Sequence, residues 1–249
     1  MQQRRQLLLL LLLSGFLAMG VKAQFYLGVE TGVTQNRLYT NYDNQAFTSY
    51  KKGTGLSIGI PVSYKVNDWF AVQASPSYIQ KNYTIERTGY FQGVYQDNRN
   101  GYIQLPVMGQ FSFGGEQLRG FVNLGMYGAY WAGSRIKGAQ LNALNPVDTA
   151  YYTVAPAYAS GEVNLYNYNE KYSFNSVKDN RFEFGWIAGI GISYETEQGY
   201  RFFLEARHTY SFTDQQKNYM INQVPRYNDT YGINIGGMID MSKLFGSSY

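Results

Sequence analysis

Residues 182–195, FEFGWIAGIGISYE, alternate strictly between two kinds of side chain, and this feature constrains the fold more than any other. A period of two is typical of a β-strand, because successive side chains point to opposite faces. One face holds Phe182, Phe184, Trp186, Ala188, Ile190, Ile192 and Tyr194, and the other holds Glu183, Gly185, Ile187, Gly189, Gly191, Ser193 and Glu195. Aromatic residues at both ends of an apolar face are typical of a strand that crosses a membrane. We therefore assign Phe182, Phe184 and Trp186 to an external aromatic girdle and Tyr194 to a periplasmic one.

The same alternation recurs in seven further runs, and most of the eight are 10–14 residues long. Strands of soluble proteins average about 5–6 residues, whereas a tilted strand that crosses a bilayer needs about 9–11. The length of the runs therefore favours membrane strands. The eight runs cover residues 25–34, 56–66, 70–78, 102–113, 122–130, 182–195, 202–212 and 231–241.

The connections between the runs are alternately long and short. Tight turns follow the second, fourth and sixth runs, at 67–68, 114–117 and 196–199, and long polar segments follow the others, at 38–53, 86–100, 135–180 and 214–229. Outer-membrane barrels have this pattern of short periplasmic turns and long external loops. An even number of strands places both termini on the periplasmic side. We predict an all-β fold, namely an eight-stranded antiparallel up-and-down transmembrane β-barrel.

A soluble sandwich or lipocalin-like barrel would also alternate, but the second face of the runs is too polar for a soluble core. Burying so many charged groups would be costly unless they were paired, whereas a polar lumen can pair and hydrate them. In hydrocarbon every backbone group needs a partner, so the first strand should pair with the eighth. Side chains can fill an eight-stranded barrel, and we expect a filled interior rather than a pore. The polar face includes Glu30, Lys65, Gln73, Gln104, Gln110, Asn123, Glu183, Glu205, Arg207, Asn234 and Asp240.

The N-terminus has the features of a secretory signal peptide. Arg4 and Arg5 precede an apolar run, and Ala23 ends a small-residue cleavage motif. An uncleaved membrane anchor is the alternative, but the apolar run is short for a membrane helix, which needs about 20 residues. We expect residues 1–23 to be removed and residues 24–249 to form the barrel domain.

Charge and cysteine content exclude several classes of function. Without residues 1–23 the chain has 18 basic and 17 acidic residues, a net charge of +1, and no basic cluster that would indicate a nucleic-acid partner. The sequence has no cysteine and one histidine, so it offers no disulfide framework, no lipidated cysteine and no common zinc site. We expect no cofactor and no metal, and an exported protein of the Gram-negative outer membrane in contact with outer-membrane lipid.

The fourth run contains YIQLPV at 102–107, the sixth is glycine-rich at 185–191, and the seventh contains FLEAR at 203–207. These motifs resemble the PorT-like outer-membrane β-barrel domains of Bacteroidota, whose fourth strand carries a Tyr-φ-x-φ-Pro-φ motif. The resemblance implies a barrel that spans the mature chain. The family has mixed functions, and PorT itself belongs to the type IX secretion machinery. The 46-residue segment 135–180 is longer than is usual in this family.

Four charged residues fall on the predicted lumen face: Glu30, Glu183, Glu205 and Arg207. Charged residues inside a membrane often mark a proton or ion path. They can also form an interior salt-bridge network that fills and locks a narrow barrel, and we favour this structural interpretation. Arg207 is the cation expected to compensate the glutamates.

His208 is the only histidine, and it falls on the outward face of the seventh run. A lipid-modifying catalytic site would need a serine two residues further on, on the same face, where the sequence has Tyr210. We therefore interpret His208 as an interfacial side chain near the external rim.

Two prolines, Pro61 and Pro106, lie in mid-strand and point inward by phase. Proline cannot donate a hydrogen bond to a strand ladder, so each predicts a local bulge that shapes the barrel.

The segment 135–180 is rich in tyrosine and asparagine, which give binding loops rigid contact area and adaptable hydrogen bonds. Alternation within 163–174 indicates that part of it could instead extend the strands above the membrane. The triad DTA at 148–150 also resembles a glycosylation signal of Bacteroidota, at Thr149. The candidate binding residues are Tyr151, Tyr152, Tyr158, Tyr166, Tyr168 and Tyr172.

These features predict a non-enzymatic outer-membrane β-barrel whose external loops bind a surface protein, a glycan or secretion machinery. The alternative is a structural or small-solute, porin-like barrel without a specific ligand, in which the loops only shield the surface. A lipid-modifying enzyme is the third interpretation.

Overall fold

The computed structural model of the protein describes residues 24–40, 47–141, 165–220 and 223–245. The predicted signal peptide and Thr149 lie outside these residues, as do three of the candidate binding residues, Tyr151, Tyr152 and Tyr158. The elements are β1 (Gln24–Tyr39), β2 (Thr48–Gly59), β3 (Val62–Lys65), β4 (Phe70–Ala74), β5 (Ser77–Gln80), β6 (Tyr83–Arg87), the 3-10 turn η2 (Gly89–Phe91), β7 (Tyr95–Gly114), β8 (Leu118–Leu141), β9 (Leu165–Lys171), β10 (Phe182–Glu195), β11 (Tyr200–Ser211), β12 (Tyr227–Asp240) and the short helix α3 (Met241–Phe245).

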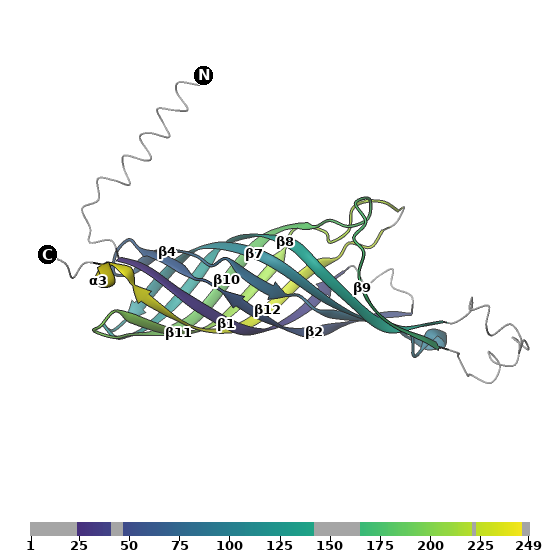
Figure 1. Ribbon diagram of the computed structural model, residues 1–249, viewed down its shortest axis with the longest axis horizontal. Helices are drawn as coiled ribbons and strands as arrows, with labels where there is room; N and C mark the ends of the chain where they lie inside the picture. Colours follow the sequence, from purple (N-terminus) through teal and green to yellow (C-terminus); the bar gives the residue numbers. More distant parts are fainter. Residues whose placement is uncertain (1–23, 41–46, 142–164, 221–222, 246–249) are drawn as a thin grey trace, which may run out of the picture.

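The strand pairings run around the molecule and return to β1. β1 pairs with β12, and the order continues through β11, β10 and β8 to β7. β7 also pairs with β4, β5 and β6. β4 pairs in turn with β3, and β5 and β6 pair with β2. Both β2 and β3 pair with β1. All pairs are antiparallel, and the sheet is rolled around a long axis (Figure 1). The prediction of an all-β antiparallel barrel is confirmed.

The described residues form twelve strands, whereas the sequence predicts eight. The second predicted strand is divided into β2 and β3 at residues 60–61, and the third, 70–78, is divided into β4 and β5 at 75–76. β6 continues the same line of chain after a further break at 81–82, beyond the predicted run. β9 is an additional strand that pairs with β8. It lies in the segment predicted as a long loop, where the alternation within 163–174 indicated a strand extension as the alternative. The alternation of residue types persists across these short breaks, which is why it does not reveal them.

Pro61 and Pro106 affect the sheet in different ways. Pro61 lies at the break between β2 and β3. The bulge predicted at Pro106 is absent, because β7 continues through this residue and pairs it with Tyr127. The interruption falls on the neighbouring segment, where the N–H of Ser75 donates to the carbonyl of Pro106 (3.2 Å). Pro106 has no N–H to donate in return, so the ladder between β7 and the segment joining β4 to β5 is broken there.

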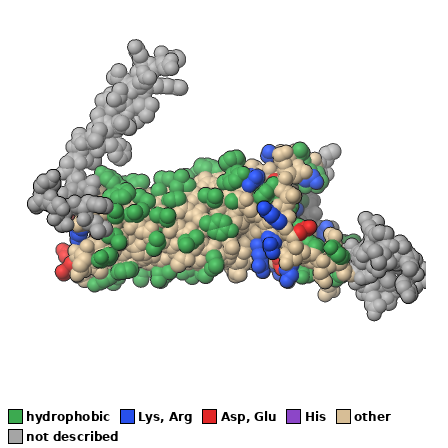
Figure 2. Space-filling view, in the orientation of Figure 1, with side chains coloured by type: hydrophobic (Ala, Val, Ile, Leu, Met, Phe, Trp, Pro, Cys, Tyr) green, Lys and Arg blue, Asp and Glu red, His purple; other side chains and the backbone are tan. Residues whose placement is uncertain are grey.

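The two faces of the sheet have opposite characters. Outward side chains are mostly apolar and exposed, for example Val29 (68%), Ile190 (62%) and Ile233 (57%). They form the hydrophobic belt that covers most of the length of the barrel in Figure 2. Inward side chains are buried and largely polar, and they include Glu30, Asn36, Gln73, Gln104, Asn123, Glu205 and Asn234. This distribution is the reverse of that in a soluble sheet and suits a barrel surrounded by lipid.

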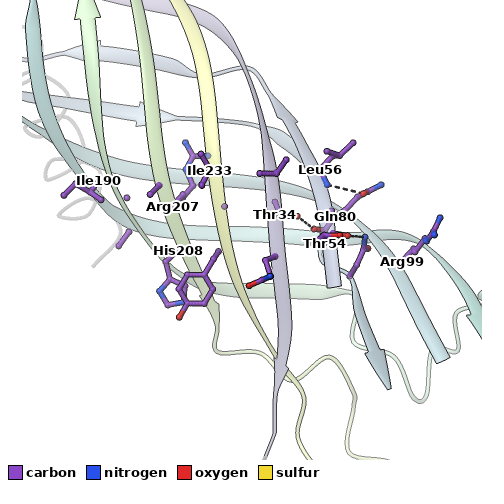
Figure 3. Close-up of a pocket in the computed structure, with 18 residues that line it drawn as sticks. Thr34, Thr54, Leu56, Gln80, Arg99, Ile190, Arg207, His208 and Ile233 are labelled. Carbon is purple, nitrogen blue, oxygen red and sulfur yellow. Dashed lines mark hydrogen bonds between the residues drawn. The ribbon is translucent and has the colours of Figure 1, made fainter. Parts of the chain in front are cut away.

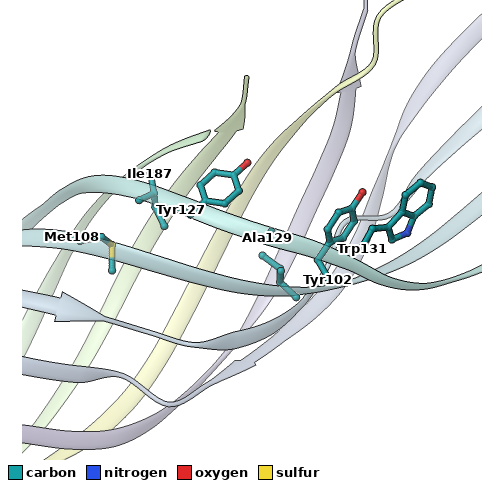
Figure 4. Packing of buried hydrophobic residues seen from close by; sticks show 7 residues of the cluster. Tyr102, Met108, Tyr127, Ala129, Trp131 and Ile187 are labelled. Carbon is teal, nitrogen blue, oxygen red and sulfur yellow. The ribbon is translucent and has the colours of Figure 1, made fainter. Parts of the chain in front are cut away.

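Large side chains fill much of the interior. Tyr102 stacks on Trp131 with 5.9 Å between ring centroids, and Met108, Tyr127 and Ile187 belong to the same buried cluster (Figure 4). A second buried cluster comprises Tyr26, Phe121, Phe203 and Met238. Three cavities lined by interior residues measure about 20, 10 and 60 Å³. Such volumes hold at most a few water molecules.

The two ends of the barrel differ. Both ends of the described chain lie at the end with the short turns (Figure 1), where Gly114 and Gly199 adopt φ angles of 119° and 90° that favour glycine. At the opposite end β7 and β8, with 20 and 24 residues, pair with β6 and β9 and extend the sheet. No helix among the described residues is long and apolar enough to cross a membrane.

Candidate functional site

A layer of three charged side chains crosses the middle of the lumen. Arg207 on β11 donates two hydrogen bonds to Glu30 on β1, Nη1 to Oε1 (3.0 Å) and Nη2 to Oε2 (3.1 Å). Nη2 also donates to Oε2 of Glu205 (2.6 Å), whose other oxygen accepts from Nδ2 of Asn123 (2.9 Å). The three charged side chains are at most 9% exposed. This layer links β1 and β11, which lie on opposite sides of β12. The bidentate geometry between Arg207 and Glu30 is the strong form of an arginine–carboxylate contact.

A second charged layer lies nearer the long-loop end. Nζ of Lys81, which is fully buried, lies 2.5 Å from Oε1 of Glu183 on β10. The same carboxylate accepts from the hydroxyl of Tyr127 (2.7 Å) and from Nδ2 of Asn228 (2.6 Å). The Lys81 ammonium also lies over the rings of Tyr127 (4.6 Å) and Tyr102 (5.1 Å). Each charge is therefore compensated by ion pairing, hydrogen bonding and ring contacts.

A third layer closes the lumen near the short turns. The hydroxyl of Tyr26 donates to Oε1 of Glu195, and Nη2 of Arg201 donates to Oε2 of the same carboxylate (3.2 Å). The Arg201 guanidinium lies 3.9 Å from the centroid of the Tyr26 ring. The lumen therefore has a paired charge layer at three levels.

The structure brings together three of the four predicted lumen residues. Arg207 contacts Glu30 and Glu205, but Glu183 belongs to the other layer, and its cation is Lys81. The expectation that Arg207 compensates all the glutamates is wrong for Glu183. Lys81 lies in the break between β5 and β6, beyond the end of the predicted run 70–78. Its side chain continues the inward phase of Gln73 and Ile79, so it was not predicted because the run was ended too early.

His208 is part of a cluster on the outer surface. Its Nε2 lies 2.6 Å from Oδ1 of Asp229, whose Oδ2 lies 2.6 Å from Nε of Arg37. The imidazole stacks on Tyr231, with 4.3 Å between centroids, and meets Trp186 edge-on at 4.9 Å. Ser211, the nearest serine in sequence, is buried and donates to the carbonyl of Thr213 (2.9 Å). His208 is thus held by an acid and two aromatic rings rather than by a nucleophile.

A groove of about 1100 Å³ passes over β10, β11, β12, β1 and β2 (Figure 3). Leu56, Ile190 and Ile233, which are exposed residues of the hydrophobic belt, line it together with His208. Because acyl chains would cover such a surface in a membrane, we assign this groove to the lipid-facing side of the barrel.

A separate crevice of about 540 Å³ opens at the long-loop end. Its lining includes residues from β2, β6, β7, β8 and β9 and from the segment that joins β11 to β12. The lining has aromatic, amide and apolar side chains, with two arginines and no acid among the described residues. The residues are Thr48, Tyr50, Ile85, Arg87, Val94, Tyr95, Gln96, Ala139, Gln140, Tyr168, Gln216, Tyr219, Met220, Gln223, Val224 and Arg226. We call it the external crevice.

The external crevice contains hydrogen-bond donors without partners. Within the described residues, Nε of Arg226 and Nε2 of Gln223 are buried and make no hydrogen bond. The Arg226 guanidinium lies 6.0 Å from the centroid of the Tyr50 ring. A buried donor without an acceptor is costly, and these two donors are left unsatisfied by the described residues around the crevice.

The candidate binding tyrosines that the structure describes have three different environments. Tyr166 is exposed on β9, and Tyr168 lines the external crevice, where its hydroxyl donates to Oε1 of Gln96 (3.2 Å). Tyr172 packs on Trp131 and donates to Oδ1 of Asp179 (2.9 Å). Burial and this hydrogen bond raise the pKa of Tyr172. Tyr172 therefore anchors the segment before β10 to the barrel, and its role as a binding residue stays a prediction.

The predicted girdle residues lie on the outer surface at both ends of β10. Phe182 meets Tyr130 with 5.1 Å between centroids, and Phe184 meets Phe212 at 6.2 Å. Trp186 packs against His208. Tyr194 is exposed near the short turns. Aromatic residues at both levels are the arrangement expected at membrane interfaces.

Sequence comparison identifies the family of this chain. Residues 2–217 match the model of the outer membrane protein beta-barrel domain. The chain belongs to this family. As an outer-membrane β-barrel domain it is located in the outer membrane, which agrees with its apolar outer face and polar interior. Among curated proteins, none matches the sequence. The described residues contain no group of three or more His, Cys, Asp or Glu side chains that could hold a metal ion.

This β-barrel domain is similar to several solved structures. Neisserial surface protein A is 12% identical, with a TM-score of 0.42, and the match covers 88% of this chain and 99% of that one. OprG of Pseudomonas aeruginosa is 11% identical, with a TM-score of 0.43 and coverage of 87% and 94%. Ail of Yersinia pestis, solved with the heparin analogue sucrose octasulfate, is 13% identical, with a TM-score of 0.39 and coverage of 87% and 99%. At this level, the likenesses carry no information on function.

Proposed function

We propose that this protein is a non-enzymatic barrel of eight transmembrane strands with a filled lumen, and that its external end binds a partner rich in hydrogen-bond acceptors. The eight-strand count treats β2 with β3, and β4 with β5 and β6, as two interrupted strands. It treats β9 as an extension beyond the membrane. The sequence of pairings from β1 through β12 and back supports this grouping.

The external crevice carries the proposal. It combines two arginines, several tyrosine rings and two unpartnered buried donors, and it has no acid in its described lining. Tyrosine rings and amide groups are well suited to sugars and peptides, and arginine recognises carboxylates. We therefore propose that the partner is an acidic glycan or an acidic segment of a surface or secretion-system protein.

The motif shared with PorT-like domains supports a link between the barrel and its external end. Tyr102, the first residue of YIQLPV, is buried, and its hydroxyl accepts from Nε2 of Gln215 (3.0 Å) and Nδ2 of Asn228 (3.2 Å). Gln215 lies in the segment that leads to the external crevice. PorT itself belongs to the type IX secretion machinery. We therefore include a secretion-system protein that contacts this segment among the proposed partners.

The non-enzymatic part of the proposal rests on the surroundings of His208. Its contacts are Asp229, Tyr231 and Trp186, which form no nucleophile–base pair with it. A lipid-modifying enzyme with a histidine base would need a hydroxyl or thiol nucleophile at hydrogen-bond distance from that histidine.

Replacing Arg87 and Arg226 by Gln tests the crevice. We expect binding to acidic glycans on an array, and recovery of cross-linked partners from intact outer membrane, to fall at least tenfold. The reason is that the ligand loses two charge-assisted contacts, each worth about 1.5–3 kcal/mol. The matched control is Lys65→Gln with Arg119→Gln, which removes two basic side chains at the short-turn end. Unchanged binding by the crevice variant, with normal insertion, would contradict the proposal.

A further inference from the structure

A row of basic side chains crosses the outer surface beyond the hydrophobic belt. Arg99 on β7 lies opposite Arg135 on β8, and Arg135 lies opposite Lys171 on β9. All three side chains are exposed. Arg99 lies between the buried residues Asn98 and Asn100, so it points outward, and its register partners share this face.

These three cations lack an acidic partner in the part of the chain that the structure describes. Like charges directly opposite each other on neighbouring strands are destabilising. By contrast, Lys51 at the same end forms a salt bridge, because its Nζ lies 2.5 Å from Oε2 of Glu86. The row therefore has the charge arrangement of a site completed by an anion from outside the chain.

The position of the row along the barrel identifies the source of that anion. The row of outward apolar side chains that comes before these cations crosses three strands. It consists of the register partners Ile103 on β7, Tyr130 on β8 and Phe182 on β10. Arg99 is four residues further along β7, roughly 10 Å along the membrane normal for a strand tilted by about 40°. The headgroup region extends about 5–8 Å beyond the hydrocarbon, and arginine and lysine side chains reach several ångströms toward it. Figure 2 shows Lys and Arg side chains gathered at this level, next to the belt.

We propose that Arg99, Arg135 and Lys171 bind the phosphate group of an outer-leaflet lipid. Two guanidinium groups on adjacent strands can each make paired hydrogen bonds to phosphate oxygens, and the ammonium group adds a third charge. None of these three residues lines the external crevice. The inference is therefore independent of the proposed function.

The test compares the full chain with the variant Arg99→Gln, Arg135→Gln, Lys171→Gln in phosphatidylcholine nanodiscs. The probe is diphosphoryl lipid A, and the reference lipid is lipid A with both phosphates removed. We measure the affinity for each lipid and the amount of lipid that stays bound in native mass spectrometry. Near an anionic surface each basic side chain is worth roughly fivefold in affinity, so we expect the triple variant to bind diphosphoryl lipid A about a hundredfold more weakly. Affinity for the dephosphorylated lipid should not change.

The control variant Lys65→Gln, Arg119→Gln, Lys243→Gln removes the same charge at the opposite end. An equal loss in this variant would overturn the proposal, because the effect would then come from net charge alone.

Inorganic phosphate at millimolar concentration should not displace the lipid, and displacement would overturn the assignment to a lipid. In neutral detergent the triple variant should unfold at the same or a higher temperature, since like charges have been removed. A lower unfolding temperature would instead indicate a structural role and would also overturn the proposal.

Discussion

Glu30 and Glu183 both lie on the inner wall of the barrel, yet each has its own cation. Glu30 shares Arg207 with Glu205, and Glu183 is paired with Lys81. Charge inside the lumen is thus paired in separate layers, each with its own hydrogen bonds, and the middle layer has one cation for two carboxylates. Each layer is expected to respond to mutation as a unit, because removing one partner leaves a buried charge uncompensated.

Replacing Arg207 by Met tests the middle layer. Glu30 and Glu205 would then be buried together without a cation, and we expect a loss of about 3–5 kcal/mol in the free energy of unfolding. The measurement is the urea midpoint together with loss of the heat-resistant, fast-migrating form on gels. The variant Glu30→Gln, Glu205→Gln, Arg207→Met removes the whole layer and should regain most of the stability. If Arg207→Met keeps the fast-migrating form, the interior network does not stabilise the barrel.

At the scale of strands, the alternation of residue types predicts which side chains face lipid and which face the lumen. It works because lipid requires apolar side chains along the whole outward face, as in 182–195. It does not predict the breaks near Pro61 and Ser75, which depend on hydrogen bonds between strands far apart in sequence. Lys81 was not predicted because the third run was ended at residue 78. The alternation within 163–174 did indicate a strand extension, which β9 forms with β8.

The external crevice could not be predicted from the sequence, although Tyr168 on its wall was a candidate. Its lining comes from five strands and two connecting segments, and no local pattern indicates that these residues meet. Tyr172 shows the opposite case, because the tyrosine content of its segment suggested binding while Trp131 and Asp179 hold it in place. Composition predicts what a side chain can do, and the packing around it decides whether it is available.

Close contact between β7 and β8 gives a prediction at this scale. A Cβ atom at Gly125 would clash with the backbone of Val107 and Met108, whereas one at Gly128 would meet nothing within 4 Å. We expect Gly125→Ala to cost about 1–3 kcal/mol in the free energy of unfolding and Gly128→Ala to be nearly neutral. Urea titration of both variants in lipid vesicles measures the difference. Equal stabilities would show that the strands can move apart without cost.

At the scale of the whole molecule, the lumen is closed by paired layers at three levels, centred on Glu195, Arg207 and Lys81. The three cavities described between interior side chains measure about 20, 10 and 60 Å³. We therefore expect no stepwise conductance in planar bilayers above that of a protein-free membrane. A porin measured in the same bilayer is the positive control. Discrete openings would favour the alternative of a small-solute barrel and would contradict a filled lumen.

The pairing of β1 with β12 has a consequence for biogenesis. These strands meet along the register from Tyr26↔Asp240 to Tyr39↔Tyr227, although they lie at opposite ends of the chain. Until β12 is in place, β1 and β11 each present an unpaired edge that could pair with another chain. Such long-range contacts are intrinsically slow to form. A chain truncated before Tyr227 would thus expose both edges for its whole lifetime, and it should depend on periplasmic chaperones or be degraded rather than accumulate in the membrane.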